Sequence, residues 1–230
     1  MTRVAIVQSN YIPWKGYFDL IASVDVFVIY DDMQYTKRDW RNRNRIKTEK
    51  GSAWLTVPVE VKGKYFQKIN EVKISDPDWA NKHWNMLHQN YREAPCYDQV
   101  KSWLQPLYMG LDAIHLSEVN KFLIQNICHH LGIKTEILDS SDFELLDERN
   151  ARLAHICQQV GGDEYVSGPA AQGYMDEAVF SERGIRVSWA DYQGYEEYSQ
   201  LWGKFDHFVT ILDLMFNVGI DAENYMKFKK

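Results

Sequence analysis

The sequence predicts an α/β fold built on a mainly parallel sheet, with a helical insertion or cap in the middle of the chain. Two observations predict this fold. Short β-branched apolar runs alternate with helical patterns at both ends of the sequence, whereas residues 76–131 carry only helical patterns. A chain of 230 residues is long enough to bury one large core, so we expect a single α/β domain over residues 1–230 that contains the insertion.

The N-terminal residues predict a βαβ unit, in which a helix joins two parallel strands. Val4–Val7 and residues 25–30 are short apolar runs rich in β-branched side chains, which favour buried strands. Between them, residues 14–24 carry apolar side chains at the spacing of one helix face, and Pro13 stands where that helix could begin. Such units are normally right-handed.

The segment that follows has less regular patterns. Residues 35–50 show no clean periodicity and predict a loop, whose length suggests a function. Residues 54–61 predict a strand in which Pro58 indicates an edge or a bulge. We expect residues 68–74 to pair with that strand, because their apolar and polar side chains alternate.

The insertion is expected to be helical throughout. One apolar stripe covers residues 79–91, and a second covers residues 100–107 with an interruption near Pro106. Ser117 is the expected N-cap of a third helix, and Gly132 is a natural residue to end it.

The last part of the chain returns to an alternation of strands and helices. This alternation is typical of βαβ units and supports the parallel sheet. The expected elements are a strand at 134–138, a helix at 153–160 closed by Gly161 and Gly162, a strand at 164–166, a helix reaching about Arg183, a strand at 185–189 and a helix at 208–216.

Composition and charge exclude several classes of protein. Hydrophobic residues make up 45% and charged residues 25% of the chain, as in globular proteins, and the net charge of −6 provides no general basic surface for nucleic acid. The 3 cysteines form no CxxC pair, so we expect neither a disulfide framework nor a zinc site. The sequence shows no signal peptide and no membrane span, so we expect a cytoplasmic protein without a membrane partner.

Polar residues follow three of the predicted strands. In an open parallel sheet, ligands bind beyond the carboxyl ends of the strands, so these segments would converge on one cleft if their strands are neighbours. Each segment alone is also compatible with ordinary turn chemistry. The segments are Gln8-Ser9-Asn10-Tyr11, Asp31-Asp32-Met33-Gln34-Tyr35 and Ser167-Gly168-Pro169.

Asp31 and Asp32 are the acidic members of this set. They could hold Mg²⁺, a ribose or a substrate amine, or could instead cap a helix or form a salt bridge. Adjacent strand residues point to opposite faces, so both reach one ion only if the strand has ended. The histidines follow no ligand pattern, so we expect no protein metal site, and GxSxG, Walker and GxGxxG motifs are absent.

The densest positive charge lies between Lys37 and Lys47, in the predicted loop of an otherwise acidic chain. Arginine forks match the oxygens of phosphate, so a phosphorylated small molecule is the expected ligand. Trp40 offers a stacking face in the same segment. A solvated basic loop is the alternative, and nucleic acid is less favoured because nothing else in the chain extends the patch.

Three stretches resemble the WbqC-like family, namely QSNYIPWKGYFD from Gln8, DVFVIYDDMQYTKRDWRNRNRIK from Asp25 and WLTVPV from Trp54. The SGP at 167–169 and the LDLMFNVG near the C-terminus resemble it too. Ser9 stands where the Q-P-x-Y pattern of the family has proline, and its polar neighbours are unchanged. The family is found with bacterial surface-polysaccharide genes, and the resemblance implies transfer of a glycyl or related acyl group to an amino sugar.

A weaker resemblance concerns the fold. A strand, polar loop and helix, then a strand ending in acidic residues and a late Ser-Gly turn, are similar to the nucleotidyltransferase and pantothenate-synthetase group, which has a Rossmann-like (HUP-like) sheet. Those enzymes bind ATP between an early HxGH loop and a late Ser-containing turn. Asn10, Tyr11, Trp14 and Gly16 occupy the equivalent stretch here. The resemblance therefore implies ATP binding more than nucleotidyl transfer, since helix N-termini can also hold phosphates.

These features together predict an enzyme, an N-acyltransferase or ATP-dependent amide ligase. Its acceptor would be the amine of an amino sugar nucleotide in bacterial surface-polysaccharide (O-antigen) biosynthesis, and its donor a carboxylic or amino acid. The expected cofactor is ATP with Mg²⁺, or alternatively an acyl thioester. A nucleotidyltransferase and a non-catalytic sugar-nucleotide-binding protein are the alternatives, the latter because aromatic surfaces suit sugar stacking.

Each candidate residue has an expected role in that reaction. Asp31 or Asp32 would take the proton of the amine, and Gln8 and Tyr11 would fix the substrate in the catalytic centre. The expected substrate- and phosphate-binding residues are Asn10, Trp14, Gln34, Tyr35, Arg38, Trp40, Arg41, Asn42, Arg43, Asn44, Lys47, Ser167 and Gly168.

Overall fold

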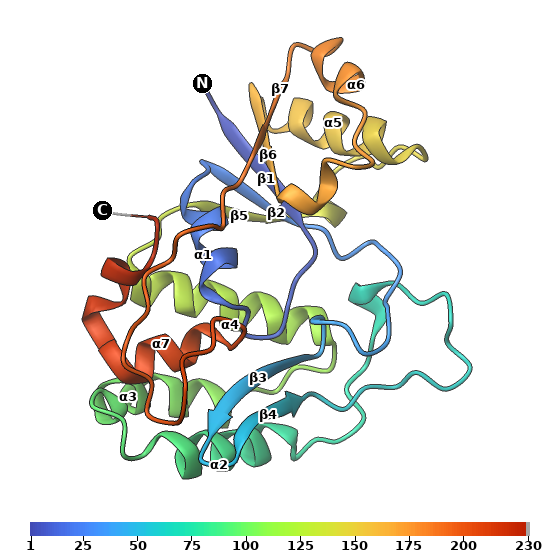
Figure 1. Ribbon diagram of the computed structural model, residues 1–230. Helices are drawn as coiled ribbons and strands as arrows, with labels where there is room; N and C mark the ends of the chain where they lie inside the picture. Colours follow the sequence, from blue (N-terminus) through green and yellow to red (C-terminus); the bar gives the residue numbers. More distant parts are fainter. Residues whose placement is uncertain (229–230) are drawn as a thin grey trace.

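Five parallel strands form the central sheet of the computed structural model, which describes residues 1–228 (Figure 1). All strand pairs in this sheet are parallel, which confirms the predicted mainly parallel α/β architecture. The narrower assignment to the nucleotidyltransferase or HUP-like group stays a prediction. In spatial order the strands are β5 (Glu136–Asp139), β2 (Val26–Ile29), β1 (Arg3–Val7), β6 (Glu164–Ser167) and β7 (Arg186–Trp189).

Helices cover both faces of this sheet (Figure 1). Alternate residues of a strand point to opposite faces, and here Ala5 and Phe27 join one apolar cluster while Val4 and Val26 join the other. The first cluster includes α1 (Lys15–Ala22) and α4 (Leu116–Leu131), and the second includes α5 (Arg149–Gln159) and α6 (Glu177–Ser181). The chain therefore changes face between β1 and β6, which makes their carboxyl ends a topological switch point.

The predicted loop at residues 35–50 is wrong in its second half. β3 (Arg43–Thr48) and β4 (Gly51–Thr56) form an antiparallel hairpin outside the main sheet. Buried and half-exposed residues alternate through most of β3, but Asn44 occupies one of the inward positions. The amide of Asn44 stands where an alternating strand pattern has an apolar side chain. The two-residue period of a strand is therefore not visible in the sequence.

The predicted pairing of residues 54–61 with 68–74 is also largely wrong. β4 ends at Thr56, before Pro58, and only a single bridge joins Val59 to Ile74 among the described residues. Residues Ile69–Glu71 form a 3₁₀ turn instead of a strand. Proline cannot donate to a strand ladder, which explains why the pairing does not extend.

The helical middle contains α2 (Trp79–Tyr91), α3 (Tyr97–Met109) and α4. Pro106 does not interrupt α3, because Val100, Leu104 and Tyr108 stay buried along the same stripe on both sides of it. This helical middle shares the cluster of buried apolar side chains that contains α1. Its interpretation as an insertion or cap stays a prediction.

Two expectations about helix ends need correction, and one is confirmed. The N-cap of α4 is His115, whose backbone N–H donates to Glu118 Oε2 at 3.0 Å, and not Ser117. Gly132 ends α4 in the left-handed conformation at φ 71°, as predicted. The long helix expected after Pro169 is replaced by a 3₁₀ turn (Pro169–Ala171) and the short α6, whose N-cap Asp176 accepts a hydrogen bond from the backbone of Ala178.

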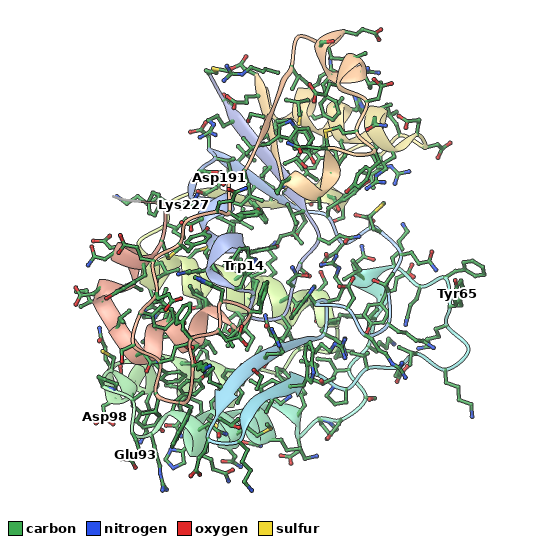
Figure 2. The ribbon with its side chains drawn as sticks, in the orientation of Figure 1. Trp14, Tyr65, Glu93, Asp98, Asp191 and Lys227 are labelled. Atoms are coloured by element: carbon green, nitrogen blue, oxygen red, sulfur yellow. The ribbon has the colours of Figure 1, made fainter. Side chains whose placement is uncertain are left out.

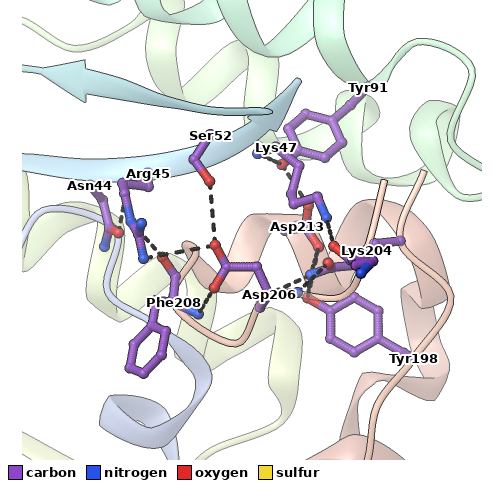
Figure 3. A network of polar contacts seen from close by, with 11 residues as sticks. Asn44, Arg45, Lys47, Ser52, Tyr91, Tyr198, Lys204, Asp206, Phe208 and Asp213 are labelled. Atoms are coloured by element: carbon purple, nitrogen blue, oxygen red, sulfur yellow. Dashed lines mark hydrogen bonds and ion pairs between the residues drawn. The ribbon is translucent and has the colours of Figure 1, made fainter. Parts of the chain in front are cut away.

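The chain from Ala190 to Val209 contains neither helix nor strand, and we call it the C-terminal strap; Asp191 near its start is labelled in Figure 2. Side chains hold it in place (Figure 3). The fully buried Asp213 of α7 (Ile211–Val218) accepts hydrogen bonds from Tyr91 at 2.7 Å and from Tyr198 at 2.7 Å. The amine of Lys47 donates to the carbonyl of Lys204. The strap is thus joined to α2, α7 and the hairpin. A 3₁₀ segment (Gly219–Tyr225) follows α7.

Within residues 1–228, no helix combines the length and the apolar character that crossing a membrane requires.

Two of the largest fully buried side chains, Tyr11 and Tyr108, meet between the segment after β1 and the helical middle. The hydroxyl of Tyr11 bonds to Tyr108 Oη at 2.6 Å and donates to His83 Nδ1 at 2.7 Å, while His83 Nε2 donates to the carbonyl of Thr56 at 3.1 Å. The imidazole is neutral at pH 7 because burial lowers the pKa of His83 to about 4, and with Nε2 as the donor its Nδ1 is the acceptor.

We predict that His83 makes the protein lose stability as the pH falls from about 6.5 to 4. Burial lowers the pKa of His83 to about 4, so the unfolded chain binds a proton in this range and the folded chain does not. One pKa unit corresponds to about 1.4 kcal/mol, so the loss attributable to His83 reaches about 3 kcal/mol. Urea unfolding of wild type and His83→Gln between pH 7 and pH 4 measures it. Parallel pH profiles for the two proteins would contradict the prediction.

Candidate functional site

The three polar segments identified in the sequence lie along one edge of the sheet. β1 stands between β2 and β6, so residues 8–11, 31–35 and 167–169 follow the carboxyl ends of three neighbouring strands. The three strands are therefore neighbours, which is the condition under which the polar segments were expected to lie close together. Three separate hollows open along this edge, and each has its own chemistry.

The first hollow, which we call the switch-point cleft, has a volume of about 450 Å³. It lies at the carboxyl ends of β1 and β6, where open α/β sheets bind ligands. Gln8, Ser167 and Gly168 from the predicted set line it. Its other lining residues are Ile6, Val7, Tyr30, Met33, Asp147, Arg149, Arg152, Leu153, Tyr165, Ala170, Ala171, Tyr174 and Met175.

Two arginines of α5 supply the positive charge of this cleft. The Arg152 guanidinium is largely occupied, because it donates to the carbonyl of Asp147 at 2.8 Å and to the hydroxyl of Tyr30 at 3.3 Å. Arg149 lies over the ring of Tyr174, 4.0 Å from its centroid. Its guanidinium forms no hydrogen bond or ion pair with any residue in 1–228. Arg149 is therefore the guanidinium of the cleft with donors available for an anion.

Sequence reasoning missed both arginines. It weighted the density of basic residues at 37–47, whereas Arg149 and Arg152 are isolated in an ordinary stretch of charged residues. One signal was present, because two arginines three positions apart share a helix face at the start of the helix that precedes β6. The start of that helix lies at the same edge as the carboxyl ends of the strands.

Asp31 is the centre of a buried hydrogen-bond network below the cleft. Its Oδ1 accepts from the backbone N–H of Ser9 at 2.8 Å, and its Oδ2 accepts from Ser9 Oγ at 2.6 Å and from Ser117 Oγ. Asn120 of α4 donates to the same Ser9 Oγ at 3.0 Å. Burial raises the pKa of Asp31, while the hydrogen bonds from Ser117 and Ser9 act in the opposite direction. Ser9 thus supplies two donors to this carboxylate, its backbone N–H and its hydroxyl.

The partners of Asp32 differ from those of Asp31, as expected because adjacent strand residues point to opposite faces. It accepts hydrogen bonds from Ser140 Oγ at 2.6 Å and from Asn70 Nδ2 at 3.2 Å, and Lys68 Nζ lies 3.6 Å away. Asp31 and Asp32 both line a second hollow of about 290 Å³, which also contains Lys121, Asp139 and His115; we call it the acidic hollow. Among residues 1–228, no group of three or more His, Cys, Asp or Glu side chains is arranged to hold a metal ion.

Arg41 is the member of the basic segment that reaches the end of β1. Its guanidinium donates to Gln8 Oε1 and to Asn10 Oδ1. Asp39 Oδ2 lies 3.6 Å from Nη2, and the buried Nε has no hydrogen-bond partner in the described chain. Arg41 therefore orients two predicted ligand-binding amides at once.

Three other residues of the segment bind backbone carbonyls with their side-chain nitrogens, so the geometry gives no support to their predicted phosphate-binding role. Asn42 donates to the carbonyl of Val57 at 2.8 Å, and Asn44 donates to the carbonyl of Ile12 at 2.8 Å. Lys47 is buried and donates to the strap, as described above. Lys47 lies on the face of β3 opposite to Asn44, because successive side chains of a strand alternate.

The remaining residues of the basic segment surround exposed aromatic rings. Arg43 lies over Trp54, 4.1 Å from the ring centroid, and Trp40 packs against Trp54 at 5.5 Å between centroids. Arg38 is exposed, and its carbonyl accepts a hydrogen bond from Arg43. Beside them lies a third hollow of about 270 Å³, the aromatic hollow, lined by Asn10, Pro13, Trp14, Trp40, Asn44 and Phe208.

Three predicted site residues are not brought to any of these hollows. The hydroxyl of Tyr11 is directed into the helical middle, as described above. Tyr35 is buried, and burial together with Asp39 raises its pKa to about 12. Gln34 is exposed and donates to the carbonyl of Tyr65 at 2.9 Å. A catalytic role for Tyr11 and ligand contacts by Tyr35 and Gln34 find no support in this geometry.

The sequence model of the WbqC-like protein family matches residues 8–225 of this chain. The chain is also similar to a protein of Mycobacterium tuberculosis (strain ATCC 25618 / H37Rv) named "Uncharacterized protein Rv1507c". The two are 56% identical over 228 residues, which cover 99% of each chain. No solved structure matches the chain significantly.

We predict that Asp31→Ala lowers the free energy of unfolding by about 3 kcal/mol or more. The substitution leaves two buried donors of Ser9 and the half-buried hydroxyl of Ser117 without this acceptor, and each unmet buried donor costs about 1–3 kcal/mol. Asp142→Ala, at an exposed position, is the matched control and should change stability by less than about 0.5 kcal/mol. Denaturant unfolding of the three proteins measures this, and equal stabilities for both variants would contradict the structural role of Asp31.

Proposed function

The chain belongs to the WbqC-like protein family, and we propose that it is an enzyme that joins an acyl group to the amine of an amino sugar nucleotide. The observation that carries this proposal is the switch-point cleft, in which Arg149 offers a guanidinium without a polar partner. A cleft of about 450 Å³ with convergent polar groups is of the size that binds a small molecule or cofactor. The proposed setting is the synthesis of a bacterial surface polysaccharide such as O-antigen.

In this proposal the cleft binds the phosphates of a nucleotide. Arg149 and Arg152 would contact phosphate oxygens, and Ser167 and the backbone at Gly168 would contact phosphate or ribose from the other side. Gln8, which Arg41 orients, would bind at the end of β1. The ligand residues thus come mainly from α5 and the strand ends, and the basic segment contributes through Arg41.

The proposed reaction activates a carboxylic or amino acid and then forms an amide. The carboxylate attacks the α-phosphorus of ATP, which is bound with Mg²⁺, and pyrophosphate leaves. The sugar amine then attacks the activated carbonyl, the bond to AMP breaks, and the amine proton passes to a carboxylate of the protein. An acyl thioester could replace ATP, with the thiol as the leaving group.

The structure favours Asp32 over Asp31 as the proposed acceptor of that proton. Asp31 is almost inaccessible and accepts three hydrogen bonds from protein donors, whereas Asp32 accepts two. Asp32 has 11% of its side chain exposed and lines the acidic hollow, so it is the more accessible carboxylate of the pair. Asp31 would then act as a positioning residue that fixes the end of β1.

We predict that nucleotide stabilises the wild type and that Arg149→Ala loses most of this effect. At a hundredfold excess over its dissociation constant, a ligand adds about 2.7 kcal/mol, which raises the melting temperature by about 5–10 °C for a protein of this size. A thermal-shift titration with Mg-ATP, then with UDP-glucosamine, measures the change. Arg92→Ala removes the same charge from an exposed position at the end of α2, far from α5, and should behave as wild type (Figure 1).

Product analysis separates the proposed reaction from its alternatives. Mass spectrometry of a mixture of protein, Mg-ATP, an amino acid pool and UDP-glucosamine should show an N-acylated sugar nucleotide together with AMP and pyrophosphate. A dinucleotide or other new phosphoanhydride would instead indicate a nucleotidyltransferase. Binding of the sugar nucleotide without any product, with ATP and with an acyl thioester, would indicate a non-catalytic binding protein and overturn the proposed reaction.

A further inference from the structure

The aromatic hollow is built from three segments that are distant in the sequence. Pro13 and Trp14 come from the segment after β1, Trp40 precedes β3, and Phe208 comes from the C-terminal strap. At about 270 Å³ the hollow is below the usual range for drug-sized ligands, which begins at about 300 Å³, so it suits one small ring. Neither the proposed nucleotide site nor the acidic network uses these rings.

The rings are held in position although they are exposed. Phe208 has 68% of its surface exposed, yet its carbonyl accepts a hydrogen bond from Arg45 Nε at 2.9 Å and its N–H donates to Asp206 at 2.8 Å (Figure 3). Trp14 packs edge-on against Tyr192 of the strap, with 5.3 Å between ring centroids. Rings that are fixed before binding lose little conformational entropy when a ligand arrives.

The side-chain acceptors of the hollow are occupied by the protein. The amide nitrogen of Asn44 donates to the backbone of residues 11 and 12, and its oxygen accepts from the N–H of Arg45. The oxygen of Asn10 is bound by Arg41. Three donors remain without a hydrogen-bond partner among the described residues that line the hollow, namely the amide nitrogen of Asn10 and the indole N–H groups of Trp14 and Trp40.

This composition suits a sugar ring better than a nucleobase. Specific recognition of a base needs matched donors and acceptors along its edge, whereas the side chains of the hollow offer free donors and both of their amide oxygens are already bound. A pyranose presents an apolar face of C–H groups, whose partial positive charge complements the negative face of an aromatic ring. Its hydroxyl groups can remain in water or accept a hydrogen bond from Asn10.

The hollow also adjoins the proposed nucleotide site. Gln8 lines the switch-point cleft and Asn10 lines the aromatic hollow, and both amide oxygens accept from the same Arg41 guanidinium. Two residues of chain span at most about 7 Å, so the Cα atoms of Gln8 and Asn10 lie no farther apart than this and the two hollows are neighbours. A sugar nucleotide with its phosphates in the cleft could therefore extend its sugar past Arg41.

We infer that the aromatic hollow binds the hexose ring of the sugar nucleotide, stacked between Trp14, Trp40 and Phe208. This inference rests on the proposed function for the identity of the whole substrate, but the sugar contact can be measured without any nucleotide. Trp40 and Phe208 are then specificity-determining residues for the sugar, and Arg41 keeps the two parts of the site in register.

The test uses protein labelled with ¹⁵N at the tryptophan indoles and titrated with the methyl glycosides of glucose, glucosamine, galactose and mannose. At least one glycoside should shift the indole signals of Trp14 and Trp40 in a saturable way. The indole of Trp202, which donates to the carbonyl of Asn90 at 2.8 Å, should not move. Phe208→Ala should weaken the binding of that glycoside about tenfold, whereas Phe66→Ala, which removes an 82% exposed phenylalanine outside the hollow, should not change it.

Two outcomes would overturn the inference. Either none of the four glycosides shifts Trp14 or Trp40, or adenosine or uridine shifts them at lower concentration than every glycoside, which would make the hollow a base site. Loss of nucleotide binding in the thermal-shift experiment would count against the switch-point cleft alone. The failure of the proposed function and the failure of the sugar site are therefore distinguishable.

Discussion

The carboxylate of Asp31 is the interaction on which the carboxyl edge of the sheet depends. It stands at the end of β2 and binds both the backbone and the hydroxyl of Ser9 after β1, together with Ser117 of α4. A buried carboxylate is costly unless every oxygen has a donor, so the three segments can take only positions that supply those donors. Asn120 of α4 extends the same network to the carbonyl of Arg41 at 2.8 Å. The position of the Arg41 backbone, and with it the orientation of Gln8 and Asn10, follows from this network.

Positive charges in this chain divide into those that hold the fold and those that face solvent at the candidate site. Lys47 is buried beside Asp213 and donates to the strap, so its charge is already used inside the protein. Arg149 stacks on the ring of Tyr174, and its guanidinium forms no hydrogen bond or ion pair within residues 1–228, so its donors are available. A guanidinium that stacks on an aromatic ring is held in place without losing its donors. This difference, and not the local density of charge, separates a candidate phosphate ligand from a scaffold residue.

The parallel sheet could be predicted because its strands include short apolar runs, as at Val4–Val7 and β2. Such runs indicate buried strands even when the tertiary contacts are unknown. The hairpin could not be predicted, because Asn44 faces inward to bind the carbonyl of Ile12, a partner that exists only in the folded chain. Ser117 likewise has the residue type of an N-cap, but its hydroxyl is recruited by a carboxylate 86 positions away in the sequence. The segments at the ends of β1, β2 and β6 follow neighbouring strands, but their side chains divide among three hollows and not one cleft, because the role of each side chain depended on partners that no local pattern identifies.

The C-terminal strap shows how a segment without helix or strand can still form one wall of a site. A chain with no backbone ladder loses its position unless side chains replace those hydrogen bonds. Here Asp213 accepts from Tyr198 and from Gln200, and the backbone of Phe208 is held by Arg45 and Asp206 (Figure 3). The ring of Phe208 can then remain exposed at a fixed place beside Trp14. Because the backbone is fixed by these polar contacts and not by burial of the ring, the ring stays accessible, which is the arrangement that the proposed sugar contact requires.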